Sequence, residues 1–198
     1  MTLDVRPAAD DVRRTSQLCR DQLEPHLDRD WTVRAGPLEW SCRETVAHIA
    51  DALGFYTAHL ASQATEWLKF DIVPHADATN LHLLRLVEAF GAALAHVIEA
   101  TPPDVHAFHH SGLWNRTGFA AMGCLETLVH TGDVAAGLEI AFDPPHDLCR
   151  LIVERVFVGA PRHQDPWEVL WWATGRGELR DRERLGPDWL VYWVKRRA

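Results

Sequence analysis

Two stretches of the chain carry the same pattern of chemically active side chains. Residues 42–51 and 124–133 both read Cys-x-Glu-Thr-x-x-His-x-x-Asp and align without gaps. Glutamate and histidine four residues apart lie one above the other on a helix, so both side chains can reach one ion. An aspartate three residues after the histidine lies one turn further along, and its side chain leans back toward the helix N-terminus. The pattern therefore predicts divalent-metal binding between two facing helices.

Three residues of the two stretches are the predicted metal ligands, namely His48, Glu126 and His130. Two neutral imidazoles and one carboxylate match an open catalytic zinc site, and they suit iron or nickel equally. Glu44 has a competing role, because Ser41 lies three residues before it and the pair predicts a capping box at a helix start. A closed site with Glu44 as a fourth ligand stays the alternative.

The two aspartates, Asp51 and Asp133, are the predicted outer partners of the histidines. Each could accept the second imidazole N–H and fix the tautomer, as carboxylates do beside metal-bound histidines. The simpler interpretation is that both aspartates are solvated and that the repeat only packs. Structure has to decide between these interpretations.

Further candidates for a pocket or a substrate site are Phe55, His59 and Arg176. His59 lies three turns after His48, along the same stripe as Phe55. Its position fits three roles: part of a pocket wall, a buried polar contact, or an acid–base group. Arg176, between two glycines, could hold a carboxylate, although a turn arginine after a helix is the simpler interpretation. An exposed loop is predicted for three histidines before residue 116 (His106, His109 and His110), with a reach into the site as the alternative.

Helical spacing dominates the sequence and predicts the elements that position these side chains. Apolar residues recur every three to four positions in five segments, and nothing before residue 175 alternates like a strand. The predicted helices cover residues 8–27, 41–62, 80–100, 118–138 and 145–157. Helices of this number and length indicate an all-α fold, a four-helix bundle with one additional helix.

A short tryptophan-rich appendage is predicted from about residue 160. A helix opens at Asp165 and ends at Gly175, and a charged, turn-rich stretch follows over residues 176–185. Residues 189–194 fit a closing strand or a docked helix. Tryptophan is dense here and predicts a tail packed on the bundle more than an aromatic binding slot (Trp167, Trp171, Trp172, Trp189 and Trp193). Because no linker composition interrupts the chain, residues 1–198 are expected to form a single metal-binding domain.

Composition limits the classes of function. The 198 residues, 47% apolar and 24% charged, are those of an ordinary soluble globular protein, and the net charge of -8 argues against nucleic acid or an anionic membrane as partner. The four cysteines form no Cys-x-x-Cys pair, which predicts buried, reduced thiols. The first residues lack the pattern of a signal peptide, and no uncharged apolar run could span a bilayer. A cytoplasmic location is expected.

The residues around the two motifs resemble a known family. Trp-Thr-Val-Arg at 31–34 and Leu-Glu-Trp-Ser-Cys-Arg-Glu-Thr-Val-Ala-His-Ile-Ala-Asp-Ala-Leu at 38–53 resemble the second-helix region of the DinB/YfiT-like superfamily. The closest branch is the mycothiol-dependent maleylpyruvate isomerase N-terminal domain. Residues 125–133 resemble its fourth-helix signature, and residues 167–176 resemble a phrase near the end of its bundle. The resemblance covers most of the chain, with the first and third helices similar only in pattern.

The resemblance implies a DinB/YfiT-like bundle in which His48, Glu126 and His130 hold a divalent metal, usually zinc, that water completes. It also implies mycothiol as co-substrate. Characterised isomerases carry a further C-terminal domain, whereas this chain ends at Ala198, so the resemblance leaves maleylpyruvate as the substrate in doubt. The predicted function is therefore metal-dependent use of a low-molecular-weight thiol, for transfer to or isomerisation of a small electrophile.

Two other classes of function stay open. One is a non-catalytic, metal-stabilised bundle that binds a small ligand or a partner chain. The other is a metal-dependent hydrolase in which a bound hydroxide is the nucleophile and no thiol is needed. For the thiol-dependent enzyme, the expected partners are a small-molecule thiol and an electrophilic substrate. The number of subunits is open too, a homodimer included.

Overall fold

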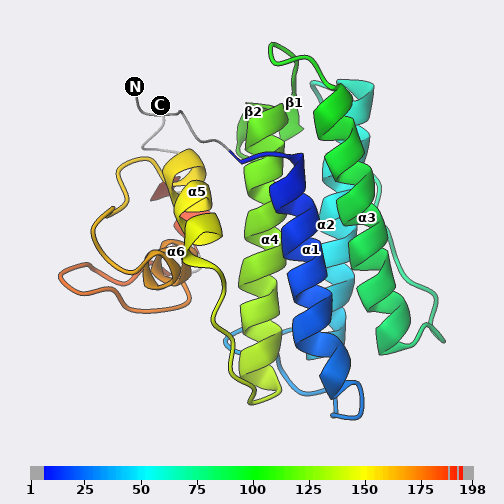
Figure 1. Cartoon of the computed structure of the whole chain (residues 1–198), viewed down its shortest axis with the longest axis vertical. Coiled ribbons are helices and arrows are strands. Elements are labelled where there is room, and N and C mark those ends of the chain that lie inside the picture. Colours follow the sequence, from blue (N-terminus) through cyan, green and yellow to red (C-terminus); the bar gives the residue numbers. More distant parts are fainter. Residues whose placement is uncertain (1–6, 187, 191, 194–198) are drawn as a thin grey trace.

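Four long helices lie side by side in the computed structural model of this chain (Figure 1). The structure describes residues 7–186, 188–190 and 192–193. α1 and α2 each pack against both α3 and α4, and their apolar faces join in one core. The helices are α1 (Ala9–Leu23), α2 (Cys42–Ser62), α3 (Asn80–Ala100) and α4 (Arg116–Gly137), and a 3-10 turn, η1 (Glu24–His26), extends α1.

Side-chain caps explain where the site-bearing helices begin. At the start of α2, the Ser41 hydroxyl accepts a hydrogen bond from the Glu44 backbone N–H (3.2 Å), and Glu44 Oε2 accepts one from the Ser41 N–H (2.8 Å). This confirms the predicted capping box. At the start of α4, Asn115 Oδ1 accepts from the Gly118 N–H. α4 therefore begins at Arg116, two residues before the predicted Gly118.

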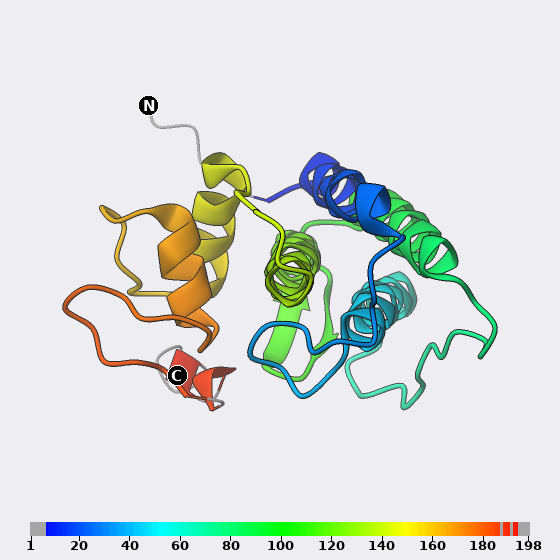
Figure 2. The ribbon, with the colours of Figure 1, turned by 90° about the horizontal axis from the view of Figure 1, so that it is seen from below.

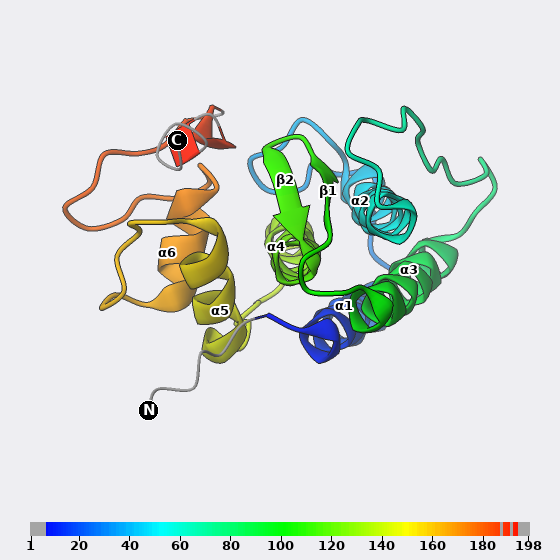
Figure 3. The same cartoon turned by 90° about the horizontal axis from the view of Figure 1, so that it is seen from above.

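A β-hairpin precedes α4, where the sequence predicted only an exposed loop. Strands β1 (His106–His109) and β2 (Gly112–Asn115) pair antiparallel, with His106 opposite Asn115 and His109 opposite Gly112. Figure 3 shows the hairpin above the end of α4 and beside α2. The prediction of no strand before residue 175 was wrong because four-residue strands are too short to show a clear alternation. Gly112, at φ 122°, permits the tight turn.

The C-terminal part packs on α4 as a separate layer (Figure 2). α5 (His146–Val156) contacts both α4 and α6 (Pro166–Ala173). Gly132 of α4 lets α6 approach closely, because a Cβ there would lie 2.9 Å from the rings of Trp167 and Trp171. The tail thus sits directly beside the part of α4 that carries His130.

The last described residues form a docked helical turn rather than a closing strand. Trp189, Leu190, Tyr192 and Trp193 are helical, while residues 191 and 194 of the predicted segment lie outside the described residues. Trp193 is buried against Phe157 and Trp172 (a 5.2 Å and a 5.9 Å ring separation), and its Nε1–H donates to the Ala173 carbonyl. The tryptophan-rich tail packs, as predicted.

The chain is mostly helical, which confirms the all-α class apart from the small hairpin. The four cysteines are buried and free, as the sequence predicted. One described helix, α3, is long and apolar enough to cross a membrane, with a mean hydropathy of 1.5. Core helices of soluble proteins pass the same test, and α3 packs against α1 and α2. The cytoplasmic location stays a prediction, and its signal-peptide argument concerns residues 1–6, outside the described part.

Candidate metal centre

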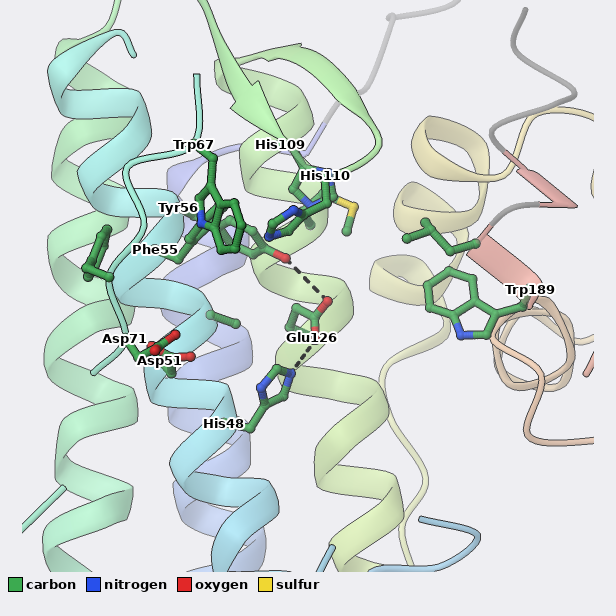
Figure 4. Close-up of a pocket in the computed structure, with 14 residues that line it drawn as sticks. His48, Asp51, Phe55, Tyr56, Trp67, Asp71, His109, His110, Glu126 and Trp189 are labelled. Carbon is green, nitrogen blue, oxygen red and sulfur yellow. Dashed lines mark hydrogen bonds and ion pairs between the residues drawn. The ribbon is translucent and has the colours of Figure 1, made fainter. Parts of the chain in front are cut away.

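The structure brings His48, Glu126 and His130 together where α2 faces α4 (Figure 4 shows the first two). Glu126 Oε2 lies 3.5 Å from His48 Nε2 and 3.2 Å from His130 Nε2. One potential ligand atom from each residue lies within 4.8 Å of the other two. Two atoms bound to one zinc at tetrahedral angles are about 3.3–3.6 Å apart, given bonds of about 2.0–2.2 Å. The two separations from Glu126 are close to this range, and the three side chains, called the trio below, have the chemistry to hold a divalent cation.

Helix spacing explains how the trio is assembled. Glu126 and His130 are one turn apart on α4, and His48 approaches them from α2. Exposure of the side chains rises from 9% for His130 through 18% for Glu126 to 33% for His48. The site is therefore anchored in the interior by α4 and opens toward solvent along the α2 side.

Behind His130, a buried ion pair fixes the orientation of the imidazole. Asp133 Oδ2 lies 2.9 Å from His130 Nδ1 and, with Oδ1, accepts hydrogen bonds from the Arg176 guanidinium at 2.7–2.9 Å. Asp133 is fully buried and Arg176 nearly so. The predicted outer-shell role of Asp133 matches this contact. Arg176, for which the sequence allowed either a carboxylate-binding role or that of a turn arginine, pairs with Asp133.

This ion pair determines which imidazole nitrogen faces Glu126. A carboxylate only accepts hydrogen bonds, so His130 Nδ1 donates to Asp133, and neutral His130 presents the Nε2 lone pair to Glu126 Oε2. A lone pair and a carboxylate oxygen repel each other at 3.2 Å unless a cation, proton or metal, lies between them. Asp133 and Glu126 against the single Arg176 guanidinium leave a net negative charge. The site electrostatically favours a positive ion.

The same charges set the pKa values in the metal-free site. Burial raises the pKa of Glu126, but hydrogen bonds from His130 and His48 outweigh it and hold that pKa well below its usual range. Burial lowers the pKa of His130, but the carboxylates of Asp133 and Glu126 more than compensate and raise it. Both shifts favour a proton on the His130 imidazole beside an ionised Glu126.

The second predicted outer carboxylate, Asp51, does not contact a histidine. Its Oδ1 accepts the backbone N–H of Ile72 at 2.7 Å, and no hydrogen bond joins it to His48 among the described residues. The segment between α2 and α3 crosses α2 at this point and supplies the donor. Glu44, whose carboxylate caps α2, is likewise not part of the site. The structure thus removes the fourth ligand of the alternative closed site.

His59 has a structural role. It is fully buried; its Nδ1 lies 2.9 Å from the Phe55 carbonyl, and its Nε2 accepts the Leu68 N–H at 3.1 Å. Both ring nitrogens are therefore engaged, and burial lowers the pKa of the imidazole. Of the open interpretations, the buried polar contact describes His59, whereas Phe55 lines a cavity beside the trio.

That cavity brings in residues that the sequence analysis missed. The Tyr56 hydroxyl donates to Glu126 Oε1 at 3.3 Å. Burial, and to a lesser degree the nearby Glu126 carboxylate, raise the pKa of Tyr56 well above its usual range. Its spacing of eight from His48 places it two turns along α2, a signal that was available. His109 and His110 reach the cavity from the hairpin (Figure 4). His109 is a buried strand residue and not the predicted loop residue, His106 is exposed but belongs to the same strand, and His110 is exposed in the turn, as predicted.

A second cavity opens on the other side of the trio. It has a volume of about 480 Å³ and is bordered by all three trio residues, by Trp40 and by Arg176 and Arg184. The Trp40 ring lies 4.8 Å from the His48 ring, centroid to centroid. Open approaches to the trio on two sides leave room for ligands other than protein.

Comparison with protein families, curated proteins and solved structures finds no match to this chain.

Proposed function

We propose that His48, Glu126 and His130 hold one divalent cation, with zinc favoured, and that the chain is a metal-dependent enzyme. The observation that carries this proposal is the convergence of the ligand atoms: Glu126 Oε2 lies 3.5 Å from His48 Nε2 and 3.2 Å from His130 Nε2, and Asp133 holds His130 Nδ1 so that Nε2 faces the centre. Two imidazoles and one carboxylate leave coordination positions open, as catalytic rather than structural zinc sites do.

We further propose that a low-molecular-weight thiol, mycothiol by the family resemblance, is a co-substrate in transfer to, or isomerisation of, a small electrophile. When bound, the metal supplies Lewis acidity that lowers the pKa of a coordinated thiol. The chain's own thiols are unsuited to the role of nucleophile, since burial raises the pKa of Cys42 to about 11 and that of Cys19, Cys124 and Cys149 to about 12.

The protein's own residues have distinct tasks in this proposal. Asp133 and Arg176 hold the His130 ring in one orientation, and Tyr56 holds Oε1 of Glu126, which leaves Oε2 toward the histidines. His48, the most exposed of the trio, faces both cavities. A DinB/YfiT-like four-helix bundle is part of the same proposal, supported by the matched motifs on α2 and α4.

Thiol binding with and without metal tests the function. We expect calorimetry to show mycothiol binding to the zinc-loaded protein and none after chelation, with turnover of small electrophiles that requires both. Equal thiol affinity in the two forms would rule the thiol mechanism out. Turnover of ester or amide substrates without any thiol would instead establish the hydrolase.

A further inference from the structure

The two cavities that meet at the trio differ in chemical character. Both are bordered by His48, Glu126 and Trp189, so ligands in them would face each other across the trio. The cavity between α2 and the hairpin, called the aromatic cavity below, has a volume of about 220 Å³. Its walls are mainly rings, contributed by α2, by the segment after α2 and by the hairpin (Phe55, Tyr56, Trp67, Phe70, His109 and His110).

The rings that line the aromatic cavity pack directly against one another and form flat walls. His110 stacks on Phe55 with 5.2 Å between the centroids and 19° between the planes, and Trp67 meets His110 edge-on at 5.5 Å. Flat walls in this arrangement suit a flat occupant, since aromatic rings prefer offset-stacked and edge-to-face contacts. Because a cavity of roughly 150 Å³ holds benzene, the aromatic cavity has space for one or two fused rings.

Charge distinguishes the two cavities as clearly as shape does. The aromatic cavity is bordered by the carboxylates of Asp51 and Asp71 in addition to Glu126, and no arginine or lysine is among its described lining residues. The opposite cavity is bordered by Arg176 and Arg184. Because Asp133 already neutralises Arg176, Arg184 is the cation that the second cavity offers an anionic ligand, whereas the described lining of the first cavity offers carboxylates and no such cation.

We propose that the aromatic cavity binds the uncharged, planar aromatic group of the substrate and places it against His48 and Glu126. The identification of this occupant with the electrophile rests on the proposed function, but the binding itself does not require a metal. The substrate class is thus an aromatic or conjugated planar electrophile without a negative charge on its ring portion. The polar or anionic co-substrate approaches from the arginine side.

Two probes of equal ring size but different charge test this inference. We would titrate the full chain with 2-naphthalenemethanol and with 2-naphthoate by calorimetry at pH 8, where ordinary imidazoles are neutral. The expected result is at least about tenfold tighter binding of the alcohol, from the carboxylates that border the cavity. Naphthoate binding that is equal or tighter and that competes with the alcohol for the same cavity would overturn the proposal.

Substitutions locate the binding and its charge preference. The double substitution Asp51→Asn and Asp71→Asn should reduce the difference in affinity between the alcohol and naphthoate. Asp104→Asn, a matched change of an exposed carboxylate beside the hairpin, should leave that difference unchanged. Ala52→Leu should fill the cavity and abolish binding of the alcohol. Trp67→Ala, at a side chain that is half exposed, should weaken the same binding several-fold and keeps the test available if Ala52→Leu does not fold. Binding of the alcohol that survives both changes would contradict the assignment.

Running each titration with and without zinc separates the two proposals. Discrimination between the probes in a protein that takes up no zinc would support the aromatic cavity and refute the metal centre. Zinc uptake without discrimination would refute the aromatic cavity alone.

Discussion

The two copies of the Cys-x-Glu-Thr-x-x-His-x-x-Asp pattern fold in the same way but do different work. In both copies the cysteine and threonine are buried, and the threonine hydroxyl donates to the carbonyl four residues earlier. The glutamates and aspartates diverge. In α4 both approach His130, whereas in α2 Glu44 caps the helix and Asp51 holds the Ile72 N–H.

Position along the helix explains the difference. Glu44 lies in the first turn of α2, where unpaired backbone N–H groups compete for its carboxylate. Glu126 lies in the middle of α4, where every backbone N–H is already bonded within the helix. Identical spacing thus fixes the face that a side chain occupies, and the local supply of donors decides its role.

Exchanging the two glutamates for glutamine gives the largest expected contrast. Glu126→Gln should weaken zinc binding by more than about 100-fold, because even changes in outer-shell partners typically cost about 10–100-fold. Glu44→Gln should leave zinc affinity unchanged. Competition titration against a chromogenic chelator measures both; similar losses in the two variants would mean that Glu44 is a ligand after all.

The aspartates provide the next contrast. Asp133→Asn removes the acceptor that orients His130 and should lower zinc affinity by about 10–100-fold, while Asp51→Asn, at the matching position, should have no effect. Since Asp133→Asn also leaves the buried Arg176 unpaired, Arg176→Gln with Asp133→Asn should recover stability without recovering zinc affinity. Recovery of both would show that Asp133 acts through folding alone.

His59 of α2 predicts a pH effect on stability. His59 is held neutral by burial, so its pKa in the folded chain lies below the unfolded value of about 6.5. Its contribution to the free energy of unfolding is present above that value and is lost as the pH falls through the folded pKa. In the metal-free protein, His59→Gln should make the fall of the unfolding free energy with decreasing pH less steep, as measured by urea titrations at several pH values. The same substitution at the exposed His163 should leave this pH dependence unchanged. An unchanged slope for His59→Gln would contradict the assignment.

The smallest expected effect concerns the capping box of α2. Glu44→Ala removes the acceptor for the Ser41 N–H and should lower Tm by about 1–4 °C. Thermal unfolding of the metal-free protein measures it. No change in Tm would show that the cap contributes little here, and a larger shift that appears only in the zinc-loaded protein would point to a ligand role.

Local geometry explains which features the sequence could predict. Helix periods, the Ser41–Glu44 cap and the contact of Asp133 with His130 all involve residues within one turn of a helix. The contacts that could not be predicted join distant segments. Arg176 pairs with Asp133, which lies 43 residues earlier in the chain, and the Ile72 N–H donates to Asp51, which lies 21 residues earlier.

The hairpin shows the same limit from another side. Its strands are four residues long, and His109 faces inward only because β1 pairs with β2 above α4. Tyr56 differs, because its spacing from His48 on α2 places it near the trio by helix geometry alone. The sequence analysis chose His59 on the same helix, but the His59 ring turns into the core.

Anomalous scattering from crystals grown with one equivalent each of iron, nickel and zinc tests the central claim most directly. Data on both sides of each absorption edge should show a single site, with zinc the favoured metal, about 2.0–2.2 Å from His48 Nε2, His130 Nε2 and a Glu126 oxygen. A map without any peak between α2 and α4, or with the ion bound elsewhere, would contradict the account.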